Sequence, residues 1–136
     1  MSKNYEVKQV IVMRKDLNMR KGKMVAQGAH ASMAVLLNHG YFLAQDQQAR
    51  DPFIINMTDD MEEWVRGSFA KICVSVDSEE QLLFIHSAAQ NAGLPCSLIQ
   101  DSGHTEFNGV PTHTAVAIGP ANSEEVNKIT GLLKLL

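Results

Sequence analysis

Residues 9–13, with the sequence QVIVM, constrain the fold more than any other segment. An uninterrupted apolar run rich in β-branched residues is typical of a strand that is buried on both faces. Asp16, Asn18 and Gly22 then mark a polar connection, and residues 23–38 contain helix-forming and small residues without proline. A buried strand that leads into a helix of this length predicts an α/β protein.

Segments further along the chain extend this pattern. Strands are predicted at 69–76, 96–100 and 112–118, and helices at 58–66, 78–91 and 122–129. Acidic residues follow Thr58 and Ser78, which is typical of a capped helix start. We therefore expect one domain over residues 1–136, with a four-stranded mixed sheet and helices on both faces, a three-layer α/β/α arrangement. An insert at about 40–60 interrupts the pattern, and residues 53–55 fit either a loop or a short strand.

The composition favours a cytoplasmic protein that does not enter a membrane. No apolar run reaches the roughly 20 residues of a membrane span, and the first residues lack the apolar core of a secretory signal. Cys73 and Cys96 lie in apolar segments, so both are expected in the core rather than in a disulfide or a zinc site. Trp64 is also expected to pack against the core. The leucine-rich residues 132–136 are expected to pack on the sheet or on a second subunit, as in a homodimer.

Charge is distributed unevenly along the chain. Residues 1–23 carry seven lysine or arginine residues against two acidic ones, a net charge of +5, whereas the whole chain has a net charge of −3. The remaining residues therefore carry −8. A basic end on an acidic body can steer a phosphate-rich partner such as a nucleic acid, and it can equally be ordinary solvated surface.

The basic turn before the first predicted helix is one candidate site. Arg20, Lys21 and Lys23 lie where the helix dipole disfavours cations, unless an anion binds between them and the free backbone N–H groups. Lys23, Gln27 and His30 are spaced four and three residues apart, so they share one face of this helix. The pattern indicates a phosphate or substrate site, but a flexible basic loop and a solvated helix face explain it equally well.

A polar turn after the third predicted strand is the other candidate site. Asp101 comes directly after that strand and opens the sequence DSGHT, residues 101–105. Ligand crevices of open α/β sheets lie beyond the carboxyl ends of strands, and a carboxylate beside hydroxyl groups can act on a water molecule that attacks a carbonyl. An Asx-type turn without a chemical role has the same composition.

Four segments, taken together, resemble one known family. They are KQVIVMRKDLNMRKGKMVAQGAHA, DSGHTEF, TAVAIGPA and ITGLLKLL. In this order they resemble the type-2 peptidyl-tRNA hydrolases, over nearly the whole chain apart from residues 40–60. The resemblance implies a hydrolase that cleaves the ester between tRNA and a peptide or N-blocked amino acid, and so recycles tRNA, with no cofactor and no metal.

The resemblance also implies roles for individual residues. The lysine-glycine-lysine motif of the family falls on Lys21, Gly22 and Lys23, its A-Q-x-x-H motif on Ala26, Gln27 and His30, and its aspartate and threonine on Asp101 and Thr105. Lys23, Asp101 and Thr105 are the implied catalytic residues. Asp101 would take or orient the proton of the attacking water, Thr105 would position that water, and Lys23 would stabilise the oxyanion or a nearby phosphate.

Basic and polar residues around these three are expected to bind the substrate. We expect Arg14, Lys15, Arg20 and Lys21 to contact the tRNA backbone, and Gln27, His30 and His104 to contribute to substrate or tRNA binding. Arg20 stands where the family commonly has glycine, and His104 where it commonly has arginine or lysine. The first change adds a cation for phosphate binding, whereas the second would weaken tRNA binding at neutral pH or make it sensitive to pH.

Two other functions fit the same residues. A protein that kept the fold without the reaction would bind tRNA, another RNA or a protein and cleave nothing. An esterase or amidase for a small acyl substrate would hydrolyse simple esters without a salt-dependent affinity for tRNA. The presence of the whole set of motif residues favours the peptidyl-tRNA hydrolase.

Overall fold

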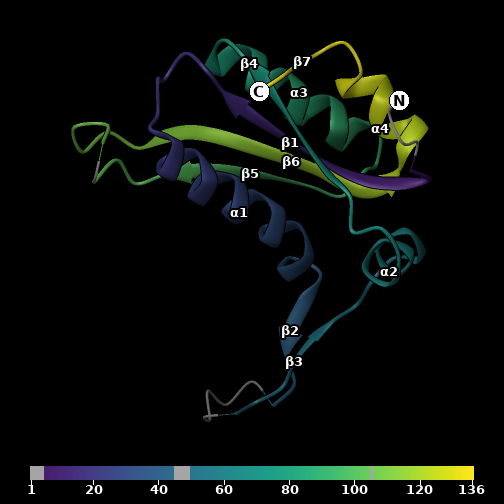
Figure 1. Cartoon of the computed structure of the whole chain (residues 1–136). Helices are drawn as coiled ribbons and strands as arrows, with labels where there is room; N and C mark the ends of the chain where they lie inside the picture. The colour runs from purple at the N-terminus through teal and green to yellow at the C-terminus, as the bar shows by residue number, and fades with distance from the viewer. Residues whose placement is uncertain (1–4, 45–49, 105) are drawn as a thin grey trace.

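The main sheet of the protein has five strands in the order β5-β6-β1-β4-β7 (Figure 1), in a computed structural model that describes residues 5–44, 50–104 and 106–136. The strands are β1 (Val7–Arg14), β4 (Lys71–Val76), β5 (Cys96–Asp101), β6 (Thr112–Asn122) and β7 (Lys134–Leu135). β1 and β4 are parallel, while β6 is antiparallel to both β1 and β5, and β7 is antiparallel to β4. The sheet is therefore mixed, as expected.

The expected count of four strands is short by one, because β7 was not predicted. This strand has two residues, which is too few for an alternation of apolar and polar side chains to be read from the sequence. Leu133 packs against the buried core, so the expected packing of residues 132–136 on the sheet is confirmed for this leucine. Leu135 pairs with Val74 of β4, but it is 73% exposed. Leu132 is fully exposed.

In the described part of the chain, four helices cover the two faces of the sheet (Figure 1), and helices on both faces were expected. α1 (Lys21–Leu37) and α2 (Asp59–Arg66) lie on one face, and α3 (Glu79–Asn91) and α4 (Ser123–Thr130) on the other. Three helix starts are capped by side chains: Thr58 and Ser78, as expected, and Asn122 each accept a backbone N–H bond in the first turn. The start of α1 has no such cap and no acidic residue in its first turn.

Alternation along β1 produces two separate cores. Val10 and Val12 face α3 and α4, whereas Ile11 and Met13 face α1 and α2. Trp64 of α2 is buried, which confirms its expected place in the core, and its indole N–H donates to the carbonyl oxygen of Ala70 at 2.8 Å. The continuous apolar sequence of β1 is thus explained by burial on both faces.

One expected core residue is not in the core. Cys73 of β4 is exposed, and Cys96 of β5 is half-buried. Cys73 shares its face of β4 with Lys71 and Ser75, and α1, which contacts β1, β5 and β6, does not cover the cysteine. A strand pattern shows which residues share a face, whereas burial depends on what lies over that face.

A small hairpin occupies the region of the expected insert. β2 (Gly40–Phe42) and β3 (Phe53–Ile55) form a separate antiparallel two-stranded sheet that projects from the body beyond the end of α1 (Figure 1). Of the two readings of residues 53–55, the short strand is therefore correct. Within the described part of the chain, no helix combines the length and apolar character that a membrane crossing requires.

The sheet topology brings the ends of three strands to one edge. β1 and β4 are parallel, and β5 runs in the same direction as β1 because both are antiparallel to β6. Their carboxyl ends, at Arg14, Val76 and Asp101, therefore share an edge of the sheet. The loops that follow β1 and β5 carry both candidate sites, so the fold brings them together.

Candidate active site

An ion pair joins the two candidate motifs. Lys23 lies in the first turn of α1, and Asp101 is the last residue of β5. The Lys23 Nζ is 2.9 Å from the Asp101 Oδ1, and both side chains are 13% exposed. A pair this well shielded from water interacts more strongly than a surface ion pair, and it stays reachable from solvent. Two motifs that are 78 residues apart in sequence thus form one site.

Two buried polar residues form a chain of hydrogen bonds that ends on Asp101. Gln27, one helical turn after Lys23, donates from Nε2 to the Asp101 Oδ1 at 3.3 Å. Thr114 of β6 in turn donates from its hydroxyl to the Gln27 Oε1. Gln27 is 2% exposed and Thr114 is completely buried. Because an amide whose oxygen accepts this bond presents its NH₂ group to the carboxylate, the chain Thr114–Gln27–Asp101 fixes the orientation of Asp101.

The other carboxylate oxygen of Asp101 is bound by the turn that follows it. The backbone N–H of Gly103 donates to Oδ2 at 2.9 Å, and Gly103 has a φ of +84°. A Cβ at this position would collide with the backbone of Val110, so only glycine fits the turn. The pKa of Asp101 is lowered from its ordinary value of 3.8, chiefly by the hydrogen bond from Lys23 and, to a smaller extent, by the bond from Gly103, against an opposing effect of burial.

Two exposed cations lie near this ion pair, at the start of α1. Arg20 and Lys21 are exposed at the uncapped start of α1, where the dipole and the free backbone N–H groups favour an anion. The Arg20 Nε is 3.8 Å from the Glu106 Oε1, although the arginine side chain is 90% exposed. The Phe107 ring lies 5.7 Å from the Lys23 Nζ, so an aromatic side chain lies next to the ion pair.

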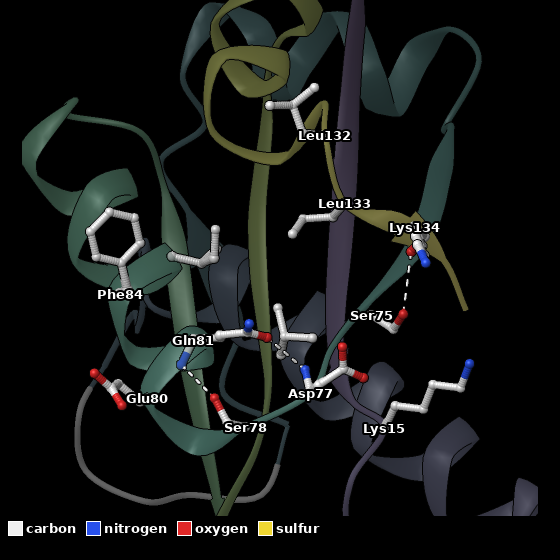
Figure 2. Close-up of a pocket in the computed structure, with 12 residues that line it drawn as sticks. Lys15, Ser75, Asp77, Ser78, Glu80, Gln81, Phe84, Leu132, Leu133 and Lys134 are labelled. Atoms are coloured by element: carbon white, nitrogen blue, oxygen red, sulfur yellow. Dashed lines mark hydrogen bonds between the residues drawn. The ribbon is translucent and has the colours of Figure 1, made fainter.

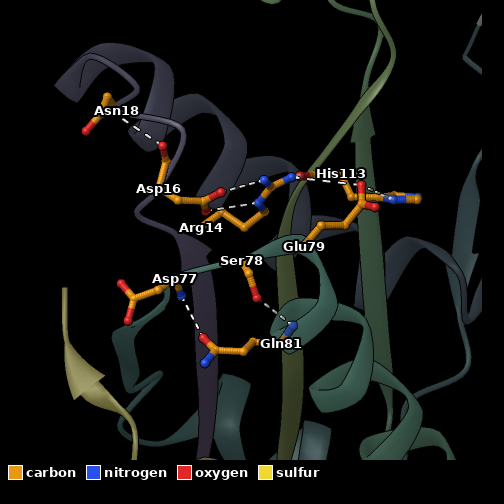
Figure 3. Close-up of polar contacts among 8 residues, drawn as sticks. All are labelled: Arg14, Asp16, Asn18, Asp77, Ser78, Glu79, Gln81 and His113. Atoms are coloured by element: carbon orange, nitrogen blue, oxygen red, sulfur yellow. Dashed lines mark hydrogen bonds and ion pairs between the residues drawn. The ribbon is translucent and has the colours of Figure 1, made fainter.

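Arg14 lies apart from this group and is paired within the protein. It donates to both carboxylate oxygens of Asp16, at 3.1 and 2.6 Å, and to the backbone carbonyl of His113 at 3.0 Å. The Glu79 Oε2 is 3.9 Å from Arg14 and 3.4 Å from the His113 Nδ1. Figure 3 shows these four side chains linking the end of β1 to β6 and α3. Arg14 therefore ties three elements together beside the site.

Lys15 lines one end of a groove beside α3 and the last turn of the chain. Figure 2 shows the lysine at one end of this groove, with Lys134 above it and Asp77 beside it. The groove has a volume of about 820 Å³, and Phe84 and Leu132 line its other end. Lys15 therefore belongs to the same edge of the sheet as Asp101, but it lines a groove to which neither Lys23 nor Asp101 contributes.

The remaining expected site residues are exposed or lie outside the described residues. His30 is exposed on α1, although it shares a helix face with Lys23 and Gln27, and His104 is exposed in the turn after β5. Thr105, an expected catalytic residue, lies outside the described residues. Thr114 was not singled out from the sequence, and the available signal was a hydroxyl residue at the start of the buried run TAVAI.

The Asp101 carboxylate accepts hydrogen bonds from an ammonium group, a side-chain amide and a backbone N–H. Over residues 5–44, 50–104 and 106–136, no three histidine, cysteine, aspartate or glutamate side chains are grouped so that they could hold a metal ion. The fold and the site together define a small α/β protein with a polar, partly buried ion pair at the carboxyl edge of its sheet, an arrangement typical of α/β enzymes.

Comparison with known proteins identifies the family. The family model described as Peptidyl-tRNA hydrolase PTH2 matches residues 7–136, and the chain belongs to this family. A relative from Methanocaldococcus jannaschii, named peptidyl-tRNA hydrolase, is 45% identical over 130 residues, which cover 96% of this chain and 100% of the relative. Relatives of the same name from Methanothermobacter thermautotrophicus and Haloquadratum walsbyi are 38% and 35% identical, over 96% and 95% of this chain and 100% and 99% of their own lengths. The resemblance found in the sequence is confirmed.

Proposed function

We propose that this protein is a peptidyl-tRNA hydrolase, which cleaves the ester between tRNA and a peptide or N-blocked amino acid and so recycles tRNA. Its family and the relatives of that name, matched over nearly the whole chain, support the activity. The structural observation that carries the proposal is the Lys23–Asp101 pair, in which a base and an acid from separate motifs meet at the edge of the sheet where α/β enzymes bind their substrates.

In the proposed reaction, the oxygen of a water molecule adds to the ester carbonyl carbon, and the bond between that carbon and the ribose oxygen then breaks. Asp101 accepts a hydrogen bond from the water and orients it. A carboxylate with a lowered pKa is a weak base, so this role suits Asp101 better than complete removal of the proton. Lys23 stabilises the negative charge that develops on the carbonyl oxygen. One water proton ends on the ribose oxygen, and the products are a peptide acid and tRNA with a free hydroxyl.

The supporting residues have proposed roles that follow from their places. Gln27 positions Asp101 through its amide, and Thr114 positions Gln27. We propose that Thr105 positions the attacking water. The exposure of His30 and His104 is compatible with contacts to tRNA rather than to the ester.

For the tRNA backbone, the proposed contacts are the exposed cations Lys15, Arg20 and Lys21. Arg14 was expected in the same role. It is the least suited of the four because its guanidinium is buried and already bonded to Asp16 and to the His113 carbonyl. Its contribution would be indirect, through the position of the loop that joins β1 to α1.

Three further proposals concern the whole molecule. We propose that residues 1–136 form one domain in which the β2–β3 hairpin is an insert, and that the protein acts in the cytoplasm, where tRNA is recycled. We propose also that it acts as a homodimer. The second and third proposals rest on the sequence and on the family's reaction.

The decisive test measures release of tRNA from an N-blocked aminoacyl-tRNA by the purified protein. A chelator in the assay removes the contribution of contaminating metal-dependent enzymes. Wild-type protein should release tRNA, and Asp101→Asn should release almost none while keeping the far-UV circular dichroism of the wild type. Asp59→Asn, which changes an exposed aspartate on α2, is the matched control and should cleave normally.

Two outcomes would contradict the proposal. Salt-dependent binding of tRNA by the wild type without any cleavage would indicate the adaptor that was considered from the sequence. Hydrolysis of simple esters without affinity for tRNA would indicate the small-acyl esterase. Normal cleavage by Asp101→Asn would leave the activity in place and remove Asp101 from its mechanism.

A further inference from the structure

The main sheet has a topological switch point between β1 and β4. These two strands are adjacent and parallel, and the backbone N–H of Lys15 donates to the carbonyl oxygen of Val76 at 2.8 Å where both strands end. The chain after β1 leads to α1 on one face of the sheet, whereas the chain after β4 leads to α3 on the other face (Figure 1). Open α/β sheets bind ligands beyond the carboxyl ends of strands where the connections part in this way. The Lys23–Asp101 pair lies at the end of β5, so the fold offers a second ligand position on the same edge.

A groove lies at this switch point. It is the groove of about 820 Å³ that Lys15 lines, and we call it the α3 groove. Residues 76–78 at the end of β4 line it together with Phe84 of α3, and Leu132 lines it from the last turn of the chain (Figure 2). Its volume is within the range of ligand pockets, which is about 300–1,000 Å³. The position that the topology favours for a ligand therefore contains a hollow large enough for one.

Two exposed apolar side chains line the α3 groove. Phe84 is 71% exposed, and Leu132 is fully exposed. Ile85 and Leu133 also line the groove, and both pack against the buried core. Apolar area that is removed from water stabilises a complex, so the two exposed side chains favour an occupant that covers them. Such an occupant has apolar side chains of its own.

The charges of the α3 groove are balanced. Lys15 and Lys134 supply two cations, Asp77 and Glu80 supply two anions, and all four are exposed. RNA in the groove would bring its negative phosphates against these carboxylates, whereas a peptide backbone is uncharged and has N–H and C=O groups that both kinds of side chain can bond. The lining therefore favours a peptide over RNA. Lys15 lies at one end of the groove, so its proposed phosphate contact is compatible with a peptide there (Figure 2).

The distance from the ion pair to the α3 groove corresponds to a short peptide. Asp101 ends β5, and the strand order β5-β6-β1-β4 places three strand spacings between the ends of β5 and β4. Neighbouring strands are about 4.8 Å apart, so these two ends are separated by about 14 Å along the edge of the sheet. An extended chain covers about 3.4 Å per residue, so about four residues span this distance. A peptide whose ester lies at Lys23 and Asp101 therefore reaches the groove with about its fifth residue.

Polar groups lie along the edge between the ion pair and the α3 groove. β6 and β1 separate β5 from β4, and Figure 3 shows Arg14 of β1 linked to His113 of β6 and to Glu79 of α3. The Glu79 side chain is 52% exposed, and the His113 side chain is 28% exposed. A carboxylate accepts hydrogen bonds and an imidazole can donate them, so a peptide backbone that crosses here finds partners for its N–H and C=O groups.

We propose that the α3 groove binds the peptide of peptidyl-tRNA, through apolar side chains about five residues from the ester. The inference rests on the proposed hydrolase activity and adds a second substrate site to it. A long peptide with apolar residues at this position then binds more tightly than an N-blocked aminoacyl-tRNA, which ends well before the groove. Because the contact is apolar, the added affinity does not depend on salt as the binding of tRNA phosphates does.

The test compares three substrates that share one tRNA and the same ester-linked alanine. One is N-acetyl-alanyl-tRNA, and the other two carry an N-acetylated peptide of six residues, with either glycine or leucine as the fifth and sixth residues from the ester. Wild-type protein should cleave all three, and the KM for the leucine peptide should be about tenfold lower than for the other two. The difference should persist when the salt concentration is raised.

Two variants of the groove should remove most of this preference. Phe84→Ser and Leu132→Ser should each raise the KM for the leucine peptide toward that for the glycine peptide. Both side chains are exposed, so neither change disturbs the core. The matched control is Val65→Ser, at a residue that is 42% exposed on α2, on the opposite face of the sheet, and it should keep the preference.

The possible results separate the peptide site from the proposed activity. Cleavage of all three substrates with equal KM would overturn the peptide site and leave the hydrolase activity in place. A preference that survives in both groove variants would overturn it as well, because the peptide would then bind elsewhere. A KM raised equally for all three substrates in these variants would mean that the groove binds tRNA and not the peptide. Absence of any cleavage would contradict the proposed function itself, and the peptide site with it.

Discussion

The two sides of α1 invert the usual distribution of side chains. On one side, the polar Gln27 is buried and bonded to Asp101 and Thr114, while Lys23 is paired and mostly covered. On the other side, the apolar Val25 and Met33 face water. Buried polar groups need partners, and exposed apolar groups gain by being covered. One side of α1 therefore has polar groups where a core is usually apolar, and the other side has apolar groups where a surface is usually polar. We expect both sides to contribute to function and not only to stability.

The comparison also shows that the two sides of α1 face different elements. Lys23 and Val25 are two residues apart on one helix, yet the lysine faces β5 and the valine faces an apolar groove that α1 and β4 line. Changes on one side should therefore leave the property of the other side intact. The predictions below test this separation, beginning with the largest effect.

Lys23→Ala should reduce the rate of tRNA release by about 100- to 1,000-fold, the usual loss when one group that stabilises an oxyanion is removed. It should leave the mass in solution unchanged, since Lys23 faces β5 and not the exposed apolar side of α1. Single-turnover kinetics and sedimentation measure the two properties on one sample. Lys128→Ala, at an exposed lysine on α4, is the control and should match the wild type in both. A dissociated Lys23→Ala variant would show that the two sides of α1 are coupled.

Thr114→Val should lower kcat about tenfold with little change in KM, because the loss of one hydrogen bond lets the Gln27 amide turn and Asp101 lose its orientation. Valine has nearly the same shape as threonine, so the packing of β6 is preserved. Thr114→Ser restores the hydroxyl and should recover most of the rate. If serine failed to rescue while valine was inactive, packing at Thr114 and not the hydrogen bond would be responsible.

Asp101→Asn should make the stability of the protein less dependent on pH in the acid range. The Lys23 hydrogen bond lowers the pKa of Asp101, so the ionised carboxylate stabilises the fold above its ordinary pKa of 3.8, and this stabilisation is lost as the pH falls below that value. The wild type should exceed the variant by about 1 kcal/mol at neutral pH, and the difference should shrink toward pH 2. Urea unfolding at a series of pH values measures it. A constant difference would mean that the pKa of Asp101 is not lowered.

Lys21→Ala should have the smallest effect. An exposed cation at the start of α1 contributes one phosphate contact, so the variant should bind tRNA about threefold more weakly, with a salt dependence reduced by about one unit of slope. The rate at saturating substrate should not change. Filter binding at several salt concentrations checks this, and an unchanged slope would remove Lys21 from the phosphate contacts.

The sequence predicted the fold and the main pair of the site because both depend on local signals. The buried run of β1, the capped helices and the two polar turns are each readable within a few residues, and the sheet edge then brings Lys23 and Asp101 together. What failed depended on neighbours distant in sequence. Cys73 was expected in the core, but α1 packs on other strands and leaves the cysteine exposed.

Arg14 and Thr114 show the same limit at the site. Arg14 was read as a tRNA contact from its charge, and nothing in its own segment shows that Asp16 and the His113 carbonyl occupy its guanidinium. Thr114 was read as part of a strand, and only the crossing of α1 over β6 reveals its bond to Gln27. Side-chain pairing between separate elements is a property of the packed structure, and periodicity does not encode it.

Trp64, the single tryptophan of the chain, gives the molecule an internal optical reporter. Its buried indole lines the apolar groove between α1 and β4 and has the Lys71 Nζ 4.8 Å from its ring. Emission from this residue should shift to longer wavelength on unfolding and respond when the groove becomes covered. A ligand bound beside Lys23, on the other side of α1, should leave the emission nearly constant. One fluorescence signal thus distinguishes a change at the groove from substrate binding beside Lys23, without any added label.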